Sequence, residues 1–266
     1  MLFKRHSKRS PKTADASSPK PPRSLGKRML HDWVFPLALV VAILTPLRQS
    51  IADWNDVPSG SMRPTILEGD RIYVNKLAFG LRVPFTTSWI THWDTPQRGE
   101  IVTFKSPADG IRLVKRVIGL PGDRIAMQGN QLIINGKMAG YSVVDKDVPT
   151  KLSDGRMVNV TYMEEQLERT STETTDPQAM PDGRRVCQHG LTIIPIAMSP
   201  STFRELIVPE GQYFMMGDNR DLSRDSRMIG FVPLESIYGR SSYVALSVDP
   251  ENSYLPRFAR WFTRMR

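Results

Sequence analysis

Two closely spaced serine residues could carry out acyl-transfer chemistry. Ser59 and Ser61 flank one glycine in the segment VPSGSMRPT, and a proline stands on each side of the group. Proline fixes φ and glycine allows close approach of the backbone, so the loop is stiff. One hydroxyl could attack a carbonyl while its neighbour donates to the developing oxyanion. The composition alone also fits an ordinary Ser/Gly/Pro loop.

A serine nucleophile needs a base, and histidine is the usual one. None of the four histidines stands in an informative context, so no Ser-His-Asp triad is indicated; they are His6, His31, His92 and His189. No His/Cys/Asp set has the spacing of metal ligands, and we expect neither a metal nor a cofactor. The one cysteine, Cys187, excludes an intrachain disulfide.

A lysine in a strand-like segment is the other candidate base. In the run IRLVKRVIG, side chains of a strand alternate between its two faces. Lys115 then shares a face with the apolar residues Ile111, Leu113 and Val117, and Arg116 points the other way. Lysine has an ordinary pKa of about 10.4, which burial lowers by up to ~5 units. A buried Lys115 could therefore deprotonate a serine, whereas a Lys115 with its amine in water could not.

An apolar run precedes the serine segment. Residues 33–47 are 15 uncharged residues, slightly fewer than the roughly 20 that a membrane-spanning helix needs. Residues 1–28 hold nine basic residues and one acidic residue, which predicts a disordered basic tail on the cytoplasmic side. We predict a transmembrane anchor over residues 29–52, with Trp33 and Trp54 at the two membrane interfaces. A cleaved signal peptide and a buried soluble helix are the alternatives.

The net charge of +9 is concentrated at the two ends of the chain. Residues 29–255 carry a net charge of −3, so the body lacks the basic cluster of a nucleic-acid groove, and we expect no nucleic-acid partner. Residues 251–266 interleave arginine with aromatic side chains. This pattern favours adsorption to anionic lipid, and a solvated terminal helix is the alternative.

Short apolar or alternating runs separated by turn residues predict a mainly β fold. Asn135-Gly136 is a strong hairpin signal, and no long helical period follows the anchor. We predict a coiled antiparallel β-sheet catalytic domain over residues 53–140 and 201–250, preceded by one transmembrane helix. Residues 141–200 are polar and irregular, and we interpret them as an inserted smaller subdomain. The predicted strands are 70–76, 100–105, 111–119, 123–127, 131–138, 191–198, 211–218 and 237–248.

Five segments, in order, resemble the sequence boxes of the bacterial type I signal peptidases (leader peptidases), which are Ser/Lys proteases. They are PSGSMRPT (58–65), GDRIYVNK (69–76), RGEIVTFKSP (98–107), VKRVIGLPGD (114–123) and GDNRDLSRDSRMIGFVP (217–233). The resemblance implies a membrane-bound endopeptidase that removes signal peptides from exported preproteins after small residues, at Ala-x-Ala sites. It also implies a bacterial inner-membrane location, with a cytoplasmic N-terminus and an extracytoplasmic catalytic domain.

The same resemblance implies a role for individual residues. Ser61 is the nucleophile and Lys115 the general base. Ser59 is an oxyanion donor beside the Ser61 backbone N–H, and Ser223 orients the Lys115 amine. Structural charges near the site are Arg116, Asp218, Asp225 and Arg227, with Arg116 paired to Asp218. Shallow apolar substrate pockets are lined by Val57, Met62, Ile66, Ile72 and Val114.

Two other functions fit the residues. One is a dedicated Ser/Lys maturation peptidase of a secretion or conjugation system, which would cut a single substrate. The other is a non-enzymatic, membrane-tethered β-rich binding domain, which would not depend on Ser61. The expected partners of the peptidase are signal peptides and membrane lipid, and the sequence carries no indication of an oligomeric state.

Overall fold

The computed structural model describes residues 30–83, 86, 88–152, 155–169, 185–194 and 199–265. The predicted tail, residues 1–28, lies outside this range. The chain divides into two compact units, residues 1–44 and 45–266. The helices are Leu30–Val34 (η1), Phe35–Ile51 (α2), Gly60–Met62 (η2), Lys76–Ala78 (η3), Ser226–Ile229 (α3), Leu234–Ser236 (η4) and Phe258–Arg260 (η5).

The π-helical turn η1 leads directly into α2, whose described apolar side chains are largely exposed. In the part of the chain that the structure describes, no helix has both the length and the apolar content needed to cross a membrane. Ala52, which the prediction included in the anchor, is the first residue of strand β1 (Ala52–Asp56).

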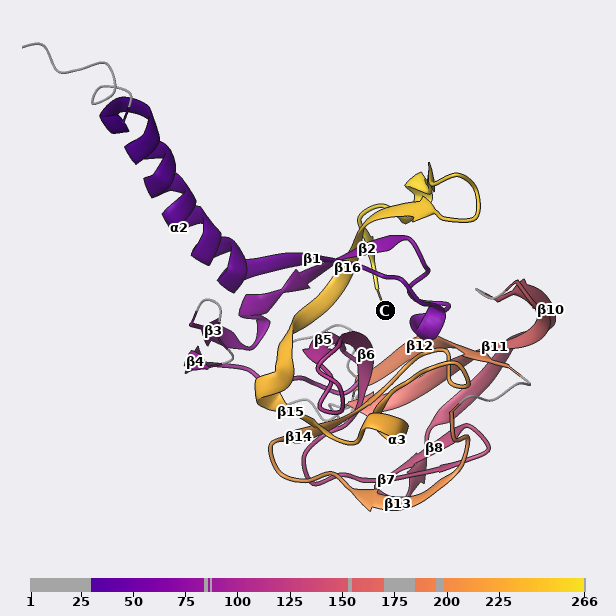
Figure 1. Cartoon of the computed structure of the whole chain (residues 1–266). Coiled ribbons are helices and arrows are strands. Elements are labelled where there is room, and N and C mark those ends of the chain that lie inside the picture. The colour runs from indigo at the N-terminus through magenta and orange to yellow at the C-terminus, as the bar shows by residue number, and fades with distance from the viewer. Residues whose placement is uncertain are drawn as a thin grey trace, which may run out of the picture. The chain divides into compact units, whose positions relative to one another are not determined.

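The second unit is mainly antiparallel β-structure (Figure 1), as the sequence predicts. Among the described residues, nine strands join in one sheet, in the order β1-β2-β16-β5-β6-β14-β15, with β17 and β18 paired to β16. Register shifts in β16 bend this long strand across β2 and β5. The strands of this sheet are Ala52–Asp56 (β1), Asp70–Asn75 (β2), Ile101–Lys105 (β5), Arg112–Gly119 (β6), Gln212–Met216 (β14), Val232–Pro233 (β15), Ile237–Asp249 (β16), Leu255–Pro256 (β17) and Thr263–Arg264 (β18).

Both faces of β6 are covered by apolar side chains. Val117 belongs to one buried cluster with Val102 and Met215, and the next residue, Ile118, belongs to another with Phe214 and others. Lys115 and Arg116 are therefore both buried, with 2% and 1% of their surface exposed. Of the three apolar neighbours predicted for Lys115, Ile111 precedes the strand and is exposed.

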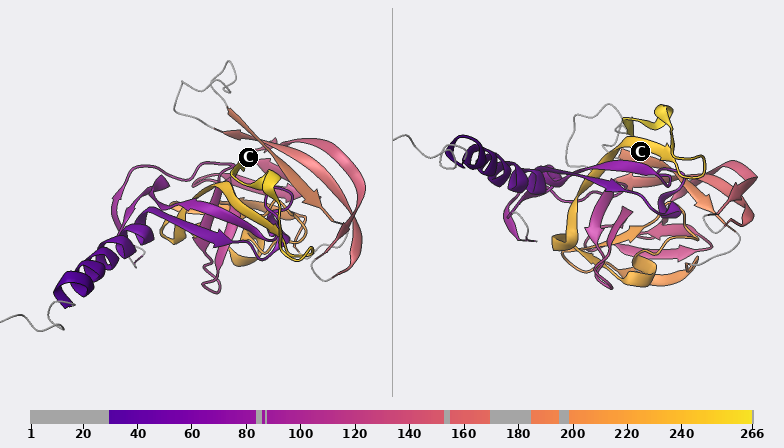
Figure 2. Two further views of the ribbon diagram at one scale, coloured as in Figure 1. Left: turned by 90° about the horizontal axis from the view of Figure 1, so that it is seen from above. Right: turned by 45° about the horizontal axis from the view of Figure 1, so that its top comes forward.

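Residues 141–200 contain long regular strands where the sequence analysis expects irregular structure. β10 (Gly140–Lys151), β11 (Met157–Arg169) and β12 (Arg185–Ile193) form a three-stranded antiparallel sheet, which we call the arm. Both views in Figure 2 show β10 and β11 as long curved ribbons. Most side chains of β10 are exposed, so no apolar alternation marks it in the sequence.

A further sheet has the order β13-β7-β8-β9, and β3 pairs with β4. Asn135 and Gly136 form the predicted hairpin turn between β8 and β9, with φ of 52° and 78°. These strands are Gly80–Arg82 (β3), Trp89–His92 (β4), Arg124–Gln128 (β7), Gln131–Ile134 (β8), Lys137–Met138 (β9) and Phe203–Ile207 (β13).

The basic C-terminal segment is fixed to the body of the protein. It contains short strands and one 3-10 turn and no α-helix among its described residues. Arg260 forms an ion pair with Asp70 at 2.6 Å and donates to the Thr65 carbonyl at 3.1 Å. These contacts brace the segment that follows Ser61.

Candidate active site

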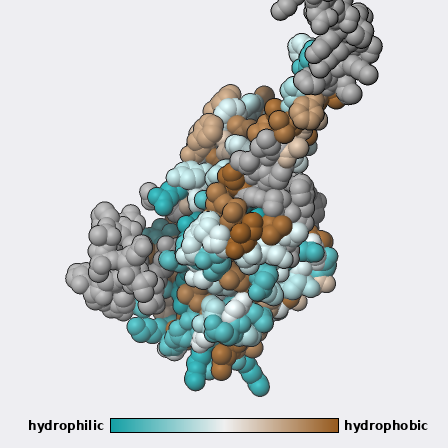
Figure 3. All heavy atoms as spheres, turned by 90° about the vertical axis from the view of Figure 1, so that its left-hand side faces the viewer, coloured by the Kyte–Doolittle hydropathy of each residue, from teal (hydrophilic) through white to brown (hydrophobic). Residues whose placement is uncertain are grey.

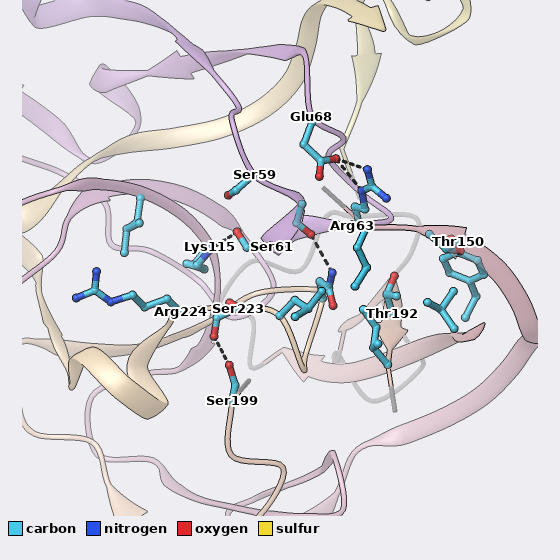
Figure 4. A pocket seen from close by; sticks show the side chains of 18 of the residues that line it. Ser59, Ser61, Arg63, Glu68, Lys115, Thr150, Thr192, Ser199, Ser223 and Arg224 are labelled. Atoms are coloured by element: carbon cyan, nitrogen blue, oxygen red, sulfur yellow. Dashed lines mark hydrogen bonds and ion pairs between the residues drawn. The ribbon is translucent and has the colours of Figure 1, made fainter. Parts of the chain in front are cut away.

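The amine of Lys115 lies against the hydroxyl of Ser61. Lys115 is in the centre of β6, and Ser61 is in the 3-10 turn η2, which begins at Gly60. Lys115 Nζ donates a hydrogen bond to Ser61 Oγ, and Figure 4 shows the two side chains pointing toward one another. Burial lowers the pKa of Lys115 to about 8, while Asp225 and Asp218 act in the opposite direction. The lysine is thus a much stronger proton acceptor near neutral pH than a solvated one.

The turn that carries Ser61 is anchored by apolar side chains beneath it. Met62 and Ile66 are fully buried, in a cluster that also contains Ile101. All five residues predicted to line substrate pockets belong to this cluster or pack against it, and none lines the cavity described below: Val57, Met62, Ile66, Ile72 and Val114. In a short turn the side chains next to Ser61 face the core, so they serve as anchors here.

The two supporting serines lie on the same cavity as Ser61. Ser59 is exposed, has extended backbone and makes no side-chain bond to the turn that it precedes. Ser223 is buried, and no hydrogen bond from it to Lys115 is found among the described residues. The Ser223 hydroxyl oxygen is one of the buried polar atoms for which no hydrogen-bond partner is found among the described residues. The expected contact between Ser223 and the amine is therefore absent from this geometry.

Asp218 links the lysine strand to the serine segment. Arg116 binds its carboxylate at 2.8 and 2.6 Å, the pairing that the sequence analysis expects. Thr65 donates to the same carboxylate at 2.5 Å. Burial alone would raise the pKa of Asp218, but the charge of Arg116 holds it below its usual value. The carboxylate thus stays ionised and ties together the segments that carry Lys115 and Ser61.

Asp225 organises the last sequence box. It is the N-cap of α3, and Arg227 binds its carboxylate at 2.8 and 2.7 Å. The Gly217 N–H also donates to it, at 3.0 Å. Burial would raise the pKa of Asp225, but the bond and charge of Arg227 lower it.

A cavity of about 390 Å³ opens beside the Lys115–Ser61 pair. Figure 4 shows Ser59, Ser61, Lys115 and Ser223 at one end and Thr150 and Thr192 at the other. The far end is apolar and is built largely by the arm, with Leu152, Val160, Tyr162, Ile194 and Leu222. Arg63, paired with Glu68 at 2.6 Å, and Arg224, paired with Asp109 at 2.5 Å, also line it.

A buried polar network from the arm was not foreseen. Glu165 binds Arg220 at 2.9 and 2.5 Å and accepts from Tyr141 at 2.5 Å. His189 lies 3.2 Å from Glu165, and burial lowers its pKa. It is not among the residues that line the cavity. Glu165 stands in a segment without a pattern, so the sequence held no signal for its role.

Among the described residues, no group of three or more His, Cys, Asp and Glu side chains is arranged to hold a metal ion. The reactive groups that the site brings together are the Ser61 hydroxyl, the Lys115 amine and nearby hydrogen-bond donors. A desolvated amine on a serine hydroxyl suits general-base activation of a nucleophile for acyl transfer.

Comparison with known proteins identifies the family of this chain. The family profile described as "Signal peptidase, peptidase S26" matches residues 30–246. A signal peptidase I of Pseudomonas fluorescens is 33% identical, covering 85% of this chain and 75% of the relative. One from Haemophilus influenzae is 30% identical and covers 85% and 73%. A solved signal peptidase I structure from Enterococcus faecalis V583 is 31% identical, covers 55% of this chain and 97% of that one, and has a TM-score of 0.30. The chain is a hydrolase that belongs to the signal peptidase family, peptidase S26.

Proposed function

We propose that this protein is a membrane-bound serine endopeptidase that removes N-terminal signal peptides from exported preproteins. Ser61 is the nucleophile and Lys115 the general base. The observation that supports this assignment is the contact between a fully buried lysine amine and the Ser61 hydroxyl at one end of the cavity. Family membership supports the substrate class, and the sequence boxes support cleavage after small residues at Ala-x-Ala sites.

The reaction follows from the positions of these groups. Neutral Lys115 takes the proton of Ser61 as Oγ attacks the scissile carbonyl carbon. The Ser59 hydroxyl and the Ser61 N–H donate to the resulting oxyanion. The C–N bond breaks as the Lys115 ammonium returns its proton to the leaving amine. Water, deprotonated by Lys115, then hydrolyses the ester and releases the signal peptide with a free carboxylate.

Two ion pairs set the electrostatics of this site. Lys115 is flanked by the buried carboxylates of Asp218 and Asp225, each paired with its own arginine, Arg116 and Arg227. Burial lowers the pKa of Lys115 and the charge of Arg227 acts in the same direction, while the carboxylates of Asp225 and Asp218 raise it. Lys115 thereby keeps a pKa close to the working pH, as a general base requires.

The membrane location rests on the N-terminal region and on exposed apolar residues. We assign residues 29–52 as the anchor, residues 1–28 to the cytoplasm and the catalytic domain to the extracytoplasmic side of the bacterial inner membrane. Apolar residues are also exposed beside the β3–β4 hairpin, where Ile90 and Trp93 are 58% and 55% exposed. Figure 3 shows hydrophobic surface on that side of the molecule. Such residues suit contact with lipid.

The direct test is preprotein cleavage by the full chain in detergent. Ser61→Ala and Lys115→Met are each expected to abolish cleavage. Lys105→Met, at an exposed position of the neighbouring strand β5, is the matched control and should cleave normally. Several unrelated preproteins should be cut by the wild type. Retained cleavage in the Lys115→Met variant would rule out the proposed mechanism.

A further inference from the structure

Asn219 makes two hydrogen bonds to consecutive carbonyls of the serine turn. Its backbone N–H donates to the Ser61 carbonyl at 3.1 Å, and its side-chain Nδ2 donates to the Gly60 carbonyl at 3.1 Å. Asn219 is 3% exposed and lines the cavity next to Ser61. One residue therefore holds the two peptide groups that flank the Ser61 α-carbon.

The bond to the Gly60 carbonyl determines where the Ser61 N–H points. That carbonyl and that N–H belong to one planar trans peptide, so they point in opposite directions. Pulling the oxygen toward Asn219 turns the N–H to the other side of the peptide. No acceptor for the Ser61 N–H is found among the described residues. The N–H is thus left free to receive a substrate oxygen.

Apart from the Asn219 side chain, only one weak hydrogen bond holds the Gly60 carbonyl in place within the part of the chain that the structure describes. The Gly60 carbonyl also accepts from the Arg63 N–H at 3.1 Å, within the three-residue 3-10 turn η2. Hydrogen-bond geometry in so short a turn is poor. Without Asn219 Nδ2, the Gly60–Ser61 peptide would be free to rock or flip.

Asn219 itself is held rigidly by the arm. It forms a parallel bridge with Thr192 of β12. Thr192 donates its N–H to the Asp218 carbonyl at 3.0 Å and accepts from the Arg220 N–H at 3.1 Å. Arg220 is in turn fixed by its ion pair with Glu165. Because the Asn219 backbone is fixed by these bonds, its side chain can hold the Gly60–Ser61 peptide in one orientation, as a catalytic site requires.

The geometry points to Asn219 as a positioning residue that orients the Ser61 N–H for oxyanion stabilisation. This inference rests on the proposed function, because it assumes that Ser61 is the nucleophile. In the part of the chain that the structure describes, Asn219 makes no hydrogen bond to Lys115, and its neutral amide does not exchange a proton in the reaction. Its effect is expected in the rate of the chemical step, with the base left intact.

The test compares Asn219→Ala and the isosteric Asn219→Asp with Asn130→Ala. The control loses a bond of the same kind, from Asn130 Nδ2 to Asp221 at 3.0 Å, away from the serine turn. Cleavage of a preprotein with an Ala-x-Ala site should show kcat lowered by ~10²-fold for both Asn219 variants, as for loss of oxyanion stabilisation. KM and the pH midpoint of kcat/KM should stay within about twofold of the wild type, and the control should match the wild type.

Three outcomes would overturn the inference. One is a kcat within about twofold of wild type for folded Asn219→Ala. Another is a shifted pH midpoint, which would mean that Asn219 acts on Lys115. The third is thermal unfolding of both Asn219 variants but not of the control, which would make the residue purely structural. Activity in Ser61→Ala would instead reject the proposed function, so the two failures are distinguishable.

Discussion

Lys115 and Ser61 are 54 residues apart in the sequence, and the amine of the first donates a hydrogen bond to the hydroxyl of the second. The contact exists because β6 lies between β5 and β14 and buries its central residues on both faces. The serine turn is brought to that strand by its apolar anchors and by the Thr65–Asp218 bond. The stable sheet thus creates the dry surroundings that make the lysine a base.

The pH dependence of cleavage tests this consequence first. Protonated Lys115 cannot accept a proton, and burial lowers its pKa to about 8. We therefore expect kcat/KM to rise with pH through about 8, because the neutral fraction of the free enzyme rises there. Initial rates of preprotein cleavage at fixed ionic strength give the profile. A flat profile from pH ~6 to ~9 would contradict a lysine base.

The lowered pKa of Lys115 should also make folding stability depend on pH, in the same direction as activity. The pKa falls from 10.5 to about 8 on folding, so native protein binds fewer protons than unfolded chain between these values. The free energy of unfolding therefore decreases as pH drops from 10.5 to about 8, because the unfolded chain binds the proton first. Lys115→Met removes that cost, which is about 3 kcal/mol, and loses a hydrogen bond of about 1 kcal/mol.

The Met variant should accordingly unfold at a higher denaturant concentration than the wild type at pH 7. The expected gain is about 2 kcal/mol, and it should shrink at higher pH as the wild-type amine becomes neutral in both states. Chemical denaturation of both proteins at matched pH measures it. A Met variant less stable than the wild type at pH 7 would show that the amine is not desolvated.

We predict that the Ser59 hydroxyl affects kcat and has no effect on folding. Its hydroxyl lines the cavity and makes no bond to the turn that follows it, so its removal should leave the fold intact. If it donates to the oxyanion, Ser59→Ala lowers kcat by ~10²–10³-fold with little change in KM. Ser142→Ala, on the exposed face of β10, is the control. A loss seen only in KM would assign Ser59 to substrate binding.

The sequence alone predicts the strand framework and the candidate pair well. Burial alternates along β2, whereas β5, β6 and β14 are buried along most of their length, so the first is an alternating pattern in the sequence and the others are short apolar runs. Lys115 stands out because it interrupts such a pattern. The arm is missed because its exposed strands need no apolar alternation.

Residues of the site that depend on tertiary packing were harder to place. The family resemblance implies that Met62 and Ile66 line a substrate pocket, but in the structure both side chains are buried in the core. His189 of the arm lies 3.2 Å from Glu165 and 3.9 Å from Asp218, residues that are distant from it in the sequence. No sequence pattern around Glu165 or His189 predicts these contacts.

Gly217 should be irreplaceable for reasons of space. A Cβ added there would lie 2.4 Å from the Ser61 carbonyl oxygen and 2.2 Å from Ser223 Oγ. The added methyl group of Gly217→Ala must push the serine turn away from Asn219. A displacement of a catalytic group by about 1 Å lowers the rate by ~10²-fold, so we expect a loss of cleavage rate of this size. Gly140→Ala, whose Cβ would meet only the Gln166 side chain at 3.3 Å, is the control. Equal activity of the two variants would show that the turn adapts freely.

The last prediction concerns the contribution of the buried Glu165–Arg220 ion pair to folding stability. Burial would raise the pKa of Glu165, but the charge of Arg220 and the contact with His189 hold it well below its usual value. A lowered carboxyl pKa stabilises the native state fully above the unfolded value of 4.5, and this stabilisation is lost progressively as pH falls from there through the lower folded value. Glu165→Gln leaves the Arg220 guanidinium buried without a counter-charge, which costs about 3–5 kcal/mol.

Replacing both partners should restore much of that stability. Glu165→Gln combined with Arg220→Met removes the unpaired cation, so the double variant is expected to unfold at a higher denaturant concentration than Glu165→Gln alone. Denaturation at pH 7 for the three proteins, with cleavage measured below their transitions, separates stability from activity. Because Arg220 follows Asn219, which holds the Ser61 turn, the folded single variant should also lose rate. A double variant no more stable than Glu165→Gln would mean that the pair's geometry, rather than its charge balance, holds the arm in place.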